Sequence, residues 1–118
     1  LYLQSQHLEN LTLTGTDNVN AVGNGLDNIL TGNSGNNSLN GGAGADIFRF
    51  LNNSGADTIQ GFQNGLDRFD FASHTLVNSM ANVTISTAGA DALVTFAGGQ
   101  FTVQGAAGLI EASDFVFA

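Results

Sequence analysis

The chain has 118 residues, with ten acidic side chains against two basic ones, Arg49 and Arg68, and a net charge of −8. This acidic composition argues against nucleic acid and anionic lipid as partners, because binding to either requires clustered Lys and Arg. It favours cations as partners instead. The absence of Cys excludes disulfides and thiolate sites, and no apolar run approaches the roughly 18–20 residues of a membrane helix, so we expect no membrane insertion.

Residues 1–22 predict degenerate strands that begin the fold. Leu8, Leu11 and Leu13 suggest one strand, and residues 14–22 form a weakened repeat with an apolar residue near its end. The chain does not begin with Met, and no basic segment followed by an apolar run precedes the fold. We therefore expect a fragment of a longer protein that lacks a cleaved N-terminal signal peptide.

A nine-residue repeat follows, and it decides the fold class. The third unit reads G-G-A-G-A-D-I-F-R and matches G-G-x-G-x-D-x-U-x, in which U is a large apolar residue, at every specified position. Six residues rich in Gly and Asn predict a tight turn, since both residue types tolerate positive φ. The next three predict a short strand whose central apolar side chain points inward. The three units begin at Gly23, Gly32 and Gly41, and their central apolar residues are Leu30, Leu39 and Phe48.

The repeat continues after two insertions. Phe50 and Leu51 interrupt the period before residues 52–60, and Gly61 interrupts it again before residues 62–70. Stacked three-residue strands bury apolar side chains that a single strand cannot bury. The pattern therefore predicts an all-β domain: a parallel β-roll over residues 23–71.

The turns are the predicted chemical sites. Two repeats make one full winding, so turns 18 residues apart stack on the same edge. We expect the turn ending at Asp46 to stack near the one ending at Asp67, and the turn ending at Asp57 to stack on the one ending at Asn37. Calcium takes 6–8 oxygens at about 2.3–2.6 Å, which stacked carbonyls and carboxylates supply.

Several calcium ions are therefore the predicted cofactor. We expect the Asp46–Asp67 and Asp57 sites to bind most tightly, and the Asn-rich first units to bind weakly or not at all. The alternative is a metal-free roll in which Asp46 and Asp57 only cap turns. The predicted ligand residues are Asp46, Asp57, Asp67, Asp27, Asn28, Asn37, Gly41, Gly42, Gly44, Gly55 and Gly65.

Residues 72–118 predict a small capping β-sheet that covers the open end of the roll. A short helix or turn over residues 72–82 has Ser73 as a possible N-cap. Three alternating segments then predict strands at residues 83–87, 92–96 and 101–104, with a hairpin at Gly98-Gly99 between the last two. A turn at residues 111–114 precedes a final apolar strand at residues 115–117.

Residues 23–71 resemble the calcium-binding β-roll of RTX proteins, which are exported by type I secretion. Residues 55–67 are similar to the segment that ends these rolls in serralysin-type proteases and mannuronan C5-epimerases, although Asp often stands there in place of Gly61. The ending at residues 112–118 is similar to the uncleaved C-terminal export signal of the same families. The resemblance implies a secreted bacterial module whose partners are calcium and the type I secretion machinery. Such a module stays unfolded in the low calcium of the cytosol and folds outside the cell.

Other functions have less support in the residues. His7 and His74, the only imidazoles, lack a partner His at metal spacing and are expected to be surface or edge residues, and no G-x-S-x-G motif is present. We therefore expect a non-catalytic module of a larger enzyme or adhesin. The alternatives are a polysaccharide-binding module, of the kind that binds alginate in epimerases, and a structural unit of an adhesin or surface layer. Arg49 and Arg68 offer little basic surface for a polyuronate.

Overall fold

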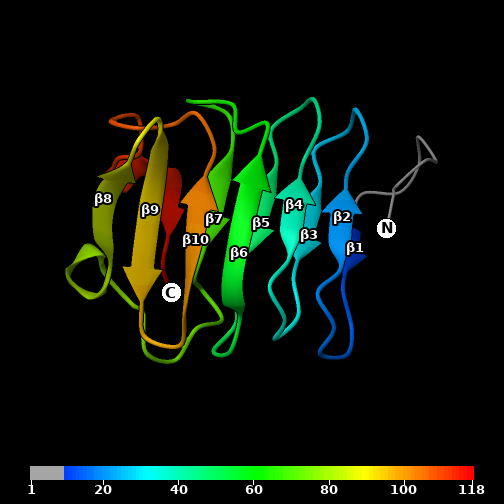
Figure 1. The fold of residues 1–118 in the computed structure, drawn as a ribbon, viewed down its shortest axis with the longest axis horizontal. Helices are drawn as coiled ribbons and strands as arrows, with labels where there is room; N and C mark the ends of the chain where they lie inside the picture. The colour runs from blue at the N-terminus through cyan, green and yellow to red at the C-terminus, as the bar shows by residue number, and fades with distance from the viewer. Residues whose placement is uncertain (1–9) are drawn as a thin grey trace.

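The computed structural model describes residues 10–118, and short strands form almost all of its regular structure (Figure 1). The chain winds back and forth between two sheets, with strand orders β1-β3-β5-β7-β11 and β2-β4-β6-β10-β9-β8. No helix in the described residues is long and apolar enough to cross a membrane. The elements are β1 (Asn10–Thr12), β2 (Asn20–Val22), β3 (Ile29–Thr31), β4 (Ser38–Asn40), β5 (Ile47–Arg49), β6 (Gly55–Gln60), β7 (Arg68–Asp70), β8 (Thr84–Ala88), β9 (Asp91–Phe96), β10 (Gly99–Val103), β11 (Phe115–Val116), and 3₁₀ helices at Met80–Asn82 and Ala112–Asp114.

The roll is the parallel β-roll that the nonapeptide pattern predicts. Within it, β1, β3, β5 and β7 pair in parallel in one sheet, and β2, β4 and β6 pair in parallel in the other. The central side chains of β3, β4 and β5, which are Leu30, Leu39 and Phe48, have no exposed surface. These three strands are each three residues long because only the middle side chain reaches the interior before the chain turns toward the opposite sheet.

The two insertions are absorbed by the turns, so the pairing of the strands is kept. Ile29 pairs with Ile47, a separation of 18 residues. Ser38 pairs with Thr58, a separation of 20, because Phe50 and Leu51 lie between β5 and β6. Ile47 pairs with Arg68, a separation of 21, because Gly61 adds one further residue. The apolar position of each repeat therefore still faces the interior after both insertions.

The capping strands are present, but they extend the sheets of the roll rather than form a sheet of their own. β10 pairs in parallel with β6, and β9 and β8 add to it in antiparallel order. The final strand, β11, pairs in parallel with β7 in the other sheet. Figure 1 shows this continuation from the roll into the C-terminal strands. Each sheet edge that the last repeat leaves open is thus covered by hydrogen-bonded strands.

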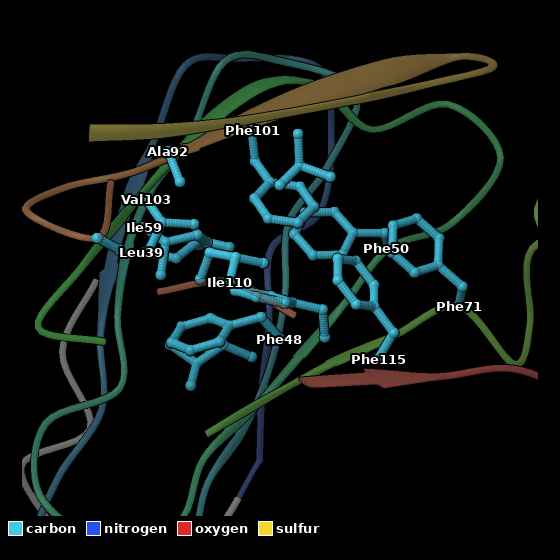
Figure 2. Close-up of a cluster of buried hydrophobic side chains, with 14 of the residues drawn as sticks. Leu39, Phe48, Phe50, Ile59, Phe71, Ala92, Phe101, Val103, Ile110 and Phe115 are labelled. Atoms are coloured by element: carbon cyan, nitrogen blue, oxygen red, sulfur yellow. The ribbon is translucent and has the colours of Figure 1, made fainter. Parts of the chain in front are cut away.

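Aromatic rings gather where the roll meets the capping strands (Figure 2). The ring of Phe50, the first inserted residue, stacks on Phe101 with centroids 4.3 Å apart and on Phe71 at 5.3 Å. Phe69 packs against Phe101 at 4.6 Å and Phe115 at 5.4 Å. The insertion therefore supplies a core side chain that joins the two parts of the fold.

Two expectations for residues 72–82 are wrong. The 3₁₀ helix follows Ser79, not Ser73, and turns occupy the segment before it. His74 is buried against the rings of Phe71 and Phe96. Its Nδ1 accepts hydrogen bonds from the backbone N–H groups of Leu76 and Val77. A neutral imidazole can end a tight turn in this way, a role that sequence spacing does not reveal. His7 and Leu8 lie outside the described residues.

Candidate metal-binding turns

The turns of the roll lie on two opposite edges. The first edge carries the turns from even- to odd-numbered strands, at residues 23–28, 41–46 and 61–67. The second edge carries the turns in the other direction, at residues 13–19, 32–37 and 50–57, the last reaching into the start of β6. Turns on one edge come from alternate repeats, so the fold brings together the turns that the repeat length predicts.

In the three repeats that begin with glycine, the sixth side chain folds back over that glycine. A Cβ atom at that glycine would collide with an oxygen of the sixth side chain, because the space is already filled. This holds for Gly23 with Asn28, for Gly32 with Asn37 and for Gly41 with Asp46. The first position is glycine because the sixth side chain occupies the place of its Cβ.

Carboxylates at the sixth position also join neighbouring turns. On the first edge the Asn28 N–H donates to Asp46 Oδ1 at 2.9 Å, and the Asp46 N–H donates to Asp67 Oδ1 at 2.8 Å. On the second edge the Asn37 N–H donates to Asp57 Oδ1 at 2.9 Å. The structure thus places Asp46 beside Asp67, Asp57 beside Asn37 and Asn28 beside Asp46.

Two of these carboxylates keep one oxygen without a partner. Asp46 Oδ2 and Asp57 Oδ2 are buried and accept no hydrogen bond from any residue between 10 and 118. Asp67 differs, since its Oδ2 accepts the N–H of Gln63 at 2.8 Å. A buried anionic oxygen without a donor is costly, and a cation bound against it would remove that cost. The buried oxygens of Asp46 and Asp57 therefore fit a calcium ligand set.

Turns with Asn at the sixth position close without a cation. Asn37 Oδ1 accepts the N–H of Asn33 at 2.9 Å, and its Nδ2 donates to the carbonyl of Val19 at 2.9 Å. Asn28 Oδ1 likewise accepts the N–H of Asn24 at 2.9 Å. An amide supplies both a donor and an acceptor, whereas a carboxylate supplies acceptors only. This difference gives a physical basis for expecting weaker calcium binding at the Asn-rich turns.

Glycine alone supplies the left-handed backbone of the described turns. Gly42 and Gly44 have φ values of +80° and +88°, and no other residue type among residues 10–118 has a positive φ. The Asn residues of these turns therefore keep a negative φ. Asn24 instead uses its side chain, whose Oδ1 accepts the N–H of Leu26 at 2.9 Å in the manner of an Asx-turn.

Backbone carbonyl oxygens are the other candidate metal ligands between stacked turns. A Cβ on Gly42 would lie 2.6 Å from the carbonyl oxygen of Asn24, and one on Gly44 would lie 2.9 Å from that of Leu26. Within residues 10–118 no three His, Asp or Glu side chains cluster in a way that could hold a metal. Calcium readily accepts backbone carbonyls, so one or two carboxylates for each site are compatible with its chemistry.

The remaining predicted ligands have other surroundings. Asp27 is exposed, and its Oδ1 accepts the N–H of Ala45 at 2.8 Å, which ties the first two turns of the first edge together. Gly55 has φ +71° and faces the carbonyl of Gly35 on the second edge. Gly65 has φ +86° and open space around it. These contacts place Asp27 in the stacking of the turns.

Sequence reasoning missed two oxygens in the same turns. Ser54 Oγ and Gln63 Oε1 are buried and have no hydrogen-bond partner in the part of the chain that the structure describes. Ser54 stands at the third position of its repeat, where the nonapeptide pattern specifies no residue type. Gln63 follows the second insertion, where the repeat register had to be inferred. Nothing in the pattern singles out either side chain.

Burial controls the protonation of the sixth-position carboxylates. Burial raises the pKa of Asp46 to about 7, and the negative charges of Asp67 and Asp27 raise it as well. The hydrogen bond from the Asn28 N–H opposes this shift and lowers the pKa. Burial also raises the pKa of Asp57 to about 7, against the N–H of Asn37. The pKa of Asp67 is raised by burial too, although two backbone N–H groups and Arg68 oppose the shift.

These shifts predict a pH dependence for the calcium-free chain. Asp46 and Asp57 hold protons more tightly when folded than when unfolded, where the pKa is near 3.8. The stability that these two groups add to the folded state is therefore fully present below about pH 4 and is lost as the pH rises through about 7. Burial lowers the pKa of His74, so near pH 6.5 this side chain is protonated mainly in the unfolded state, and it opposes the loss of stability there but not at higher pH.

We expect the melting temperature in chelator to fall between about pH 6.5 and about pH 8, and saturating calcium to abolish the fall. Thermal melts followed by circular dichroism at both pH values would check this. A calcium-free chain that gains stability across that interval would contradict it.

Comparison with known proteins agrees with this geometry. Residues 22–50 match the family model of the RTX calcium-binding nonapeptide repeat in four copies. A search of curated proteins gave no match. Among solved structures, the extracellular lipase LipA of Serratia marcescens is similar with a TM-score of 0.66 and 19% identity, over 99% of this chain and 21% of the lipase. The AlgE6R3 subunit of the Azotobacter vinelandii mannuronan C5-epimerase is similar with a TM-score of 0.62 and 24% identity, over 99% of this chain and 77% of that subunit. The chain spans about a fifth of the length of the lipase.

Proposed function

We propose that this chain, whose residues 22–50 are RTX calcium-binding nonapeptide repeats, is a module that folds on calcium outside the cell and stabilises a larger secreted protein. The observation that carries the proposal is the pair of buried, unpartnered oxygens, Asp46 Oδ2 and Asp57 Oδ2. Without a cation these carboxylates oppose folding at neutral pH. With calcium they become ligands, so the binding energy becomes folding energy.

The ligand set follows from the stacking of the turns. On the first edge, Asp46 and Asp67 would hold calcium together with carbonyls of the glycine turn at residues 41–44. On the second edge, Asp57 would hold it with the turn that ends at Asn37. The bound ion supplies positive charge and up to eight coordination positions. Asp27 and Asn28 would contribute to a weaker site, and Gly55 and Gly65 shape their turns.

The module is proposed to act as one non-catalytic domain in three segments. Residues 1–22 begin the stack, residues 23–71 form the calcium-binding roll, and residues 72–118 cap it and end in a C-terminal export signal. The structural likeness to an extracellular lipase supports a place in a secreted protein. In the low calcium of the cytosol the carboxylates would keep the chain unfolded for the type I secretion machinery, and calcium outside would fold it.

A calcium titration tests this function. We expect strand signal by circular dichroism and a cooperative melt to appear only on addition of calcium, with more than one ion bound by calorimetry. Magnesium should not substitute, because it demands octahedral geometry and loses its waters reluctantly. A chain that is fully folded in chelator and binds no calcium would overturn the proposal and favour a scaffold role in an adhesin or surface layer.

Polysaccharide binding is the second candidate, and the likeness to the epimerase subunit favours it. Both Arg side chains come from neighbouring strands of one sheet, beside the inward-facing Phe48 and Phe69, so they point outward. Arg49 pairs with Asp70 at 3.1 Å, whereas within the described residues Arg68 donates only to the carbonyl of Asp67. A uronate polymer would therefore depend on Arg68.

We expect any binding of a mannuronan oligomer to be lost in Arg68→Ala and to weaken steeply with salt, as measured by calorimetry. Binding that survives this substitution would exclude Arg68 as its origin.

A further inference from the structure

The three Asn-Gly pairs of the chain differ in how firmly their side chains are held. The Oδ1 of Asn24 accepts the N–H of Leu26, and the Oδ1 of Asn40 accepts the N–H of Gly42 at 3.0 Å. Asn64 is exposed, as is Gly65 after it, and no hydrogen bond to the Asn64 side chain is found within residues 10–118. Open space surrounds Gly65. One pair is therefore free to react while the other two are fixed.

We propose that Asn64 is a site of spontaneous deamidation, and that its conversion to isoaspartate loosens the turn that holds Asp67. The backbone nitrogen of Gly65 attacks the side-chain amide carbon of Asn64, so a C–N bond forms and the amide nitrogen leaves as ammonia with the proton given up by Gly65. Water then opens the resulting succinimide at either carbonyl, and the residue becomes aspartate or isoaspartate. The reaction consumes one water, releases one ammonia and needs no oxidant or reductant.

Geometry protects the other two pairs. Attack requires the side-chain carbon to rotate onto the nitrogen of the next residue, and glycine permits this because it lacks a Cβ. The side chain of Asn24 is held by a hydrogen bond from the Leu26 N–H, and that of Asn40 by one from the Gly42 N–H. Each bond keeps the side-chain carbon away from the backbone nitrogen of the following glycine. Gly41 is also buried between Asp46 and the neighbouring turn. These two pairs should react slowly as long as the roll is folded.

The site matters because it lies in the middle of the turn that positions Asp67. The N–H groups of Leu66 and Asp67 both donate to the carbonyl of Gln63 at 3.0 Å, across the Asn64–Gly65 peptide. Asp67 in turn accepts the N–H groups of Gln63 and Asp46. Isoaspartate adds a carbon to the backbone inside this turn, so these bonds cannot all be kept. Ordinary aspartate leaves the backbone unchanged.

Peptide mapping by mass spectrometry tests the site directly. The calcium-loaded chain is incubated at mildly alkaline pH and sampled over time. We expect deamidation at Asn64 well before Asn24 or Asn40, and equal rates at all three when the chain is held in denaturant. Asn64→Gln should remove the early product, because Gln closes a larger ring and reacts slowly. Folded protein in which Asn24 or Asn40 keeps pace with Asn64 would overturn the proposal.

The effect on calcium rests on the proposed function and has a separate readout. We expect aged protein to lose calcium affinity in calorimetry, whereas fresh Asn64→Asp keeps it, because only isoaspartate lengthens the turn. Equal affinities of aged and fresh protein would overturn the coupling to Asp67 while leaving the modification site in place. A fresh chain that binds no calcium would instead refute the calcium function, and the peptide map would still decide the modification.

Discussion

Replacing Asp46 with Asn is expected to weaken calcium binding and, at the same time, to stabilise the calcium-free fold. Asn keeps the oxygen that accepts the N–H of Asn28, so the stacking of the turns survives. It replaces the unpartnered Oδ2 with an N–H₂ group that can donate to a carbonyl, as Asn37 does to Val19. The buried charge and the orphaned acceptor disappear together.

The two effects have opposite signs, which makes the substitution informative. We expect calcium affinity at the first edge to fall by about tenfold to a hundredfold, because ligand charge sets affinity at such sites. The free energy of unfolding in chelator should rise by about 1–3 kcal/mol, the usual cost of an unsatisfied buried acceptor. Calorimetric titration with calcium and urea unfolding in chelator measure the two quantities.

Asp17→Asn is the matched control. It removes the same charge from an exposed side chain in the degenerate first repeat, so both quantities should change little. If Asp46→Asn weakens calcium binding but also destabilises the calcium-free chain, then Asp46 caps its turn as a carboxylate, and the metal-free interpretation of these turns gains support. An unchanged calcium stoichiometry and affinity would remove Asp46 from the ligand set.

The roll could be predicted because each of its features repeats. Gly23, Gly32 and Gly41 mark the turns, and the apolar residue seven positions after each of them marks the buried side chain. The insertions at Phe50–Leu51 and Gly61 could be located because the pattern resumes after them, and the strand pairing agrees with that register. Periodic local signals of this kind survive without knowledge of distant contacts.

The cap could be predicted only as separate strands. Segments near β8, β9 and β10 alternate as strands do, and Gly98-Gly99 marks their hairpin. Their attachment to β6 depends on a pairing between Gly55 and Gly99, which lie far apart in the chain. No local pattern encodes such a contact, so the sequence predicts a capping sheet without its attachment to β6.

The candidate site divides in the same way. The positions of Asp46, Asp57 and Asp67 follow from the repeat, and so does the stacking of their turns. Which carboxylate oxygen stays unpartnered does not follow, because it depends on the backbone of each turn. Asp67 uses both oxygens, since the turn after the second insertion presents the N–H of Gln63 to it. The hydrogen bonds of each turn, rather than its residue type alone, distinguish Asp67 from Asp46.

Gly23→Ala is expected to destabilise the fold severely, although it adds a single methyl group to a surface turn. The added Cβ would overlap the carbonyl oxygen of Gly41 in the next turn and the Oδ1 of Asn28 in its own. The first of these is backbone and cannot move without separating the stacked turns. We expect a loss of about 2–3 kcal/mol or more in the free energy of unfolding, the upper range for overpacking. Calcium affinity at the first edge should fall as well, because the Gly41 turn carries Asp46, the proposed ligand.

Gly25→Ala isolates the cause, because it changes the same turn two residues further on. Nothing lies within 4 Å of a Cβ at Gly25, and neither glycine has a positive φ. Alanine there should leave stability unchanged or raise it by about 0.4–1 kcal/mol, since it restricts the unfolded chain. Urea unfolding of both variants in saturating calcium gives the comparison. If the two alanines cost the same, close stacking of the turns does not limit stability, and the cations would have to hold the edges together across a wider gap. If only Gly23→Ala fails, direct backbone contact sets the spacing of the turns, and calcium binds in a frame that the glycines have already defined.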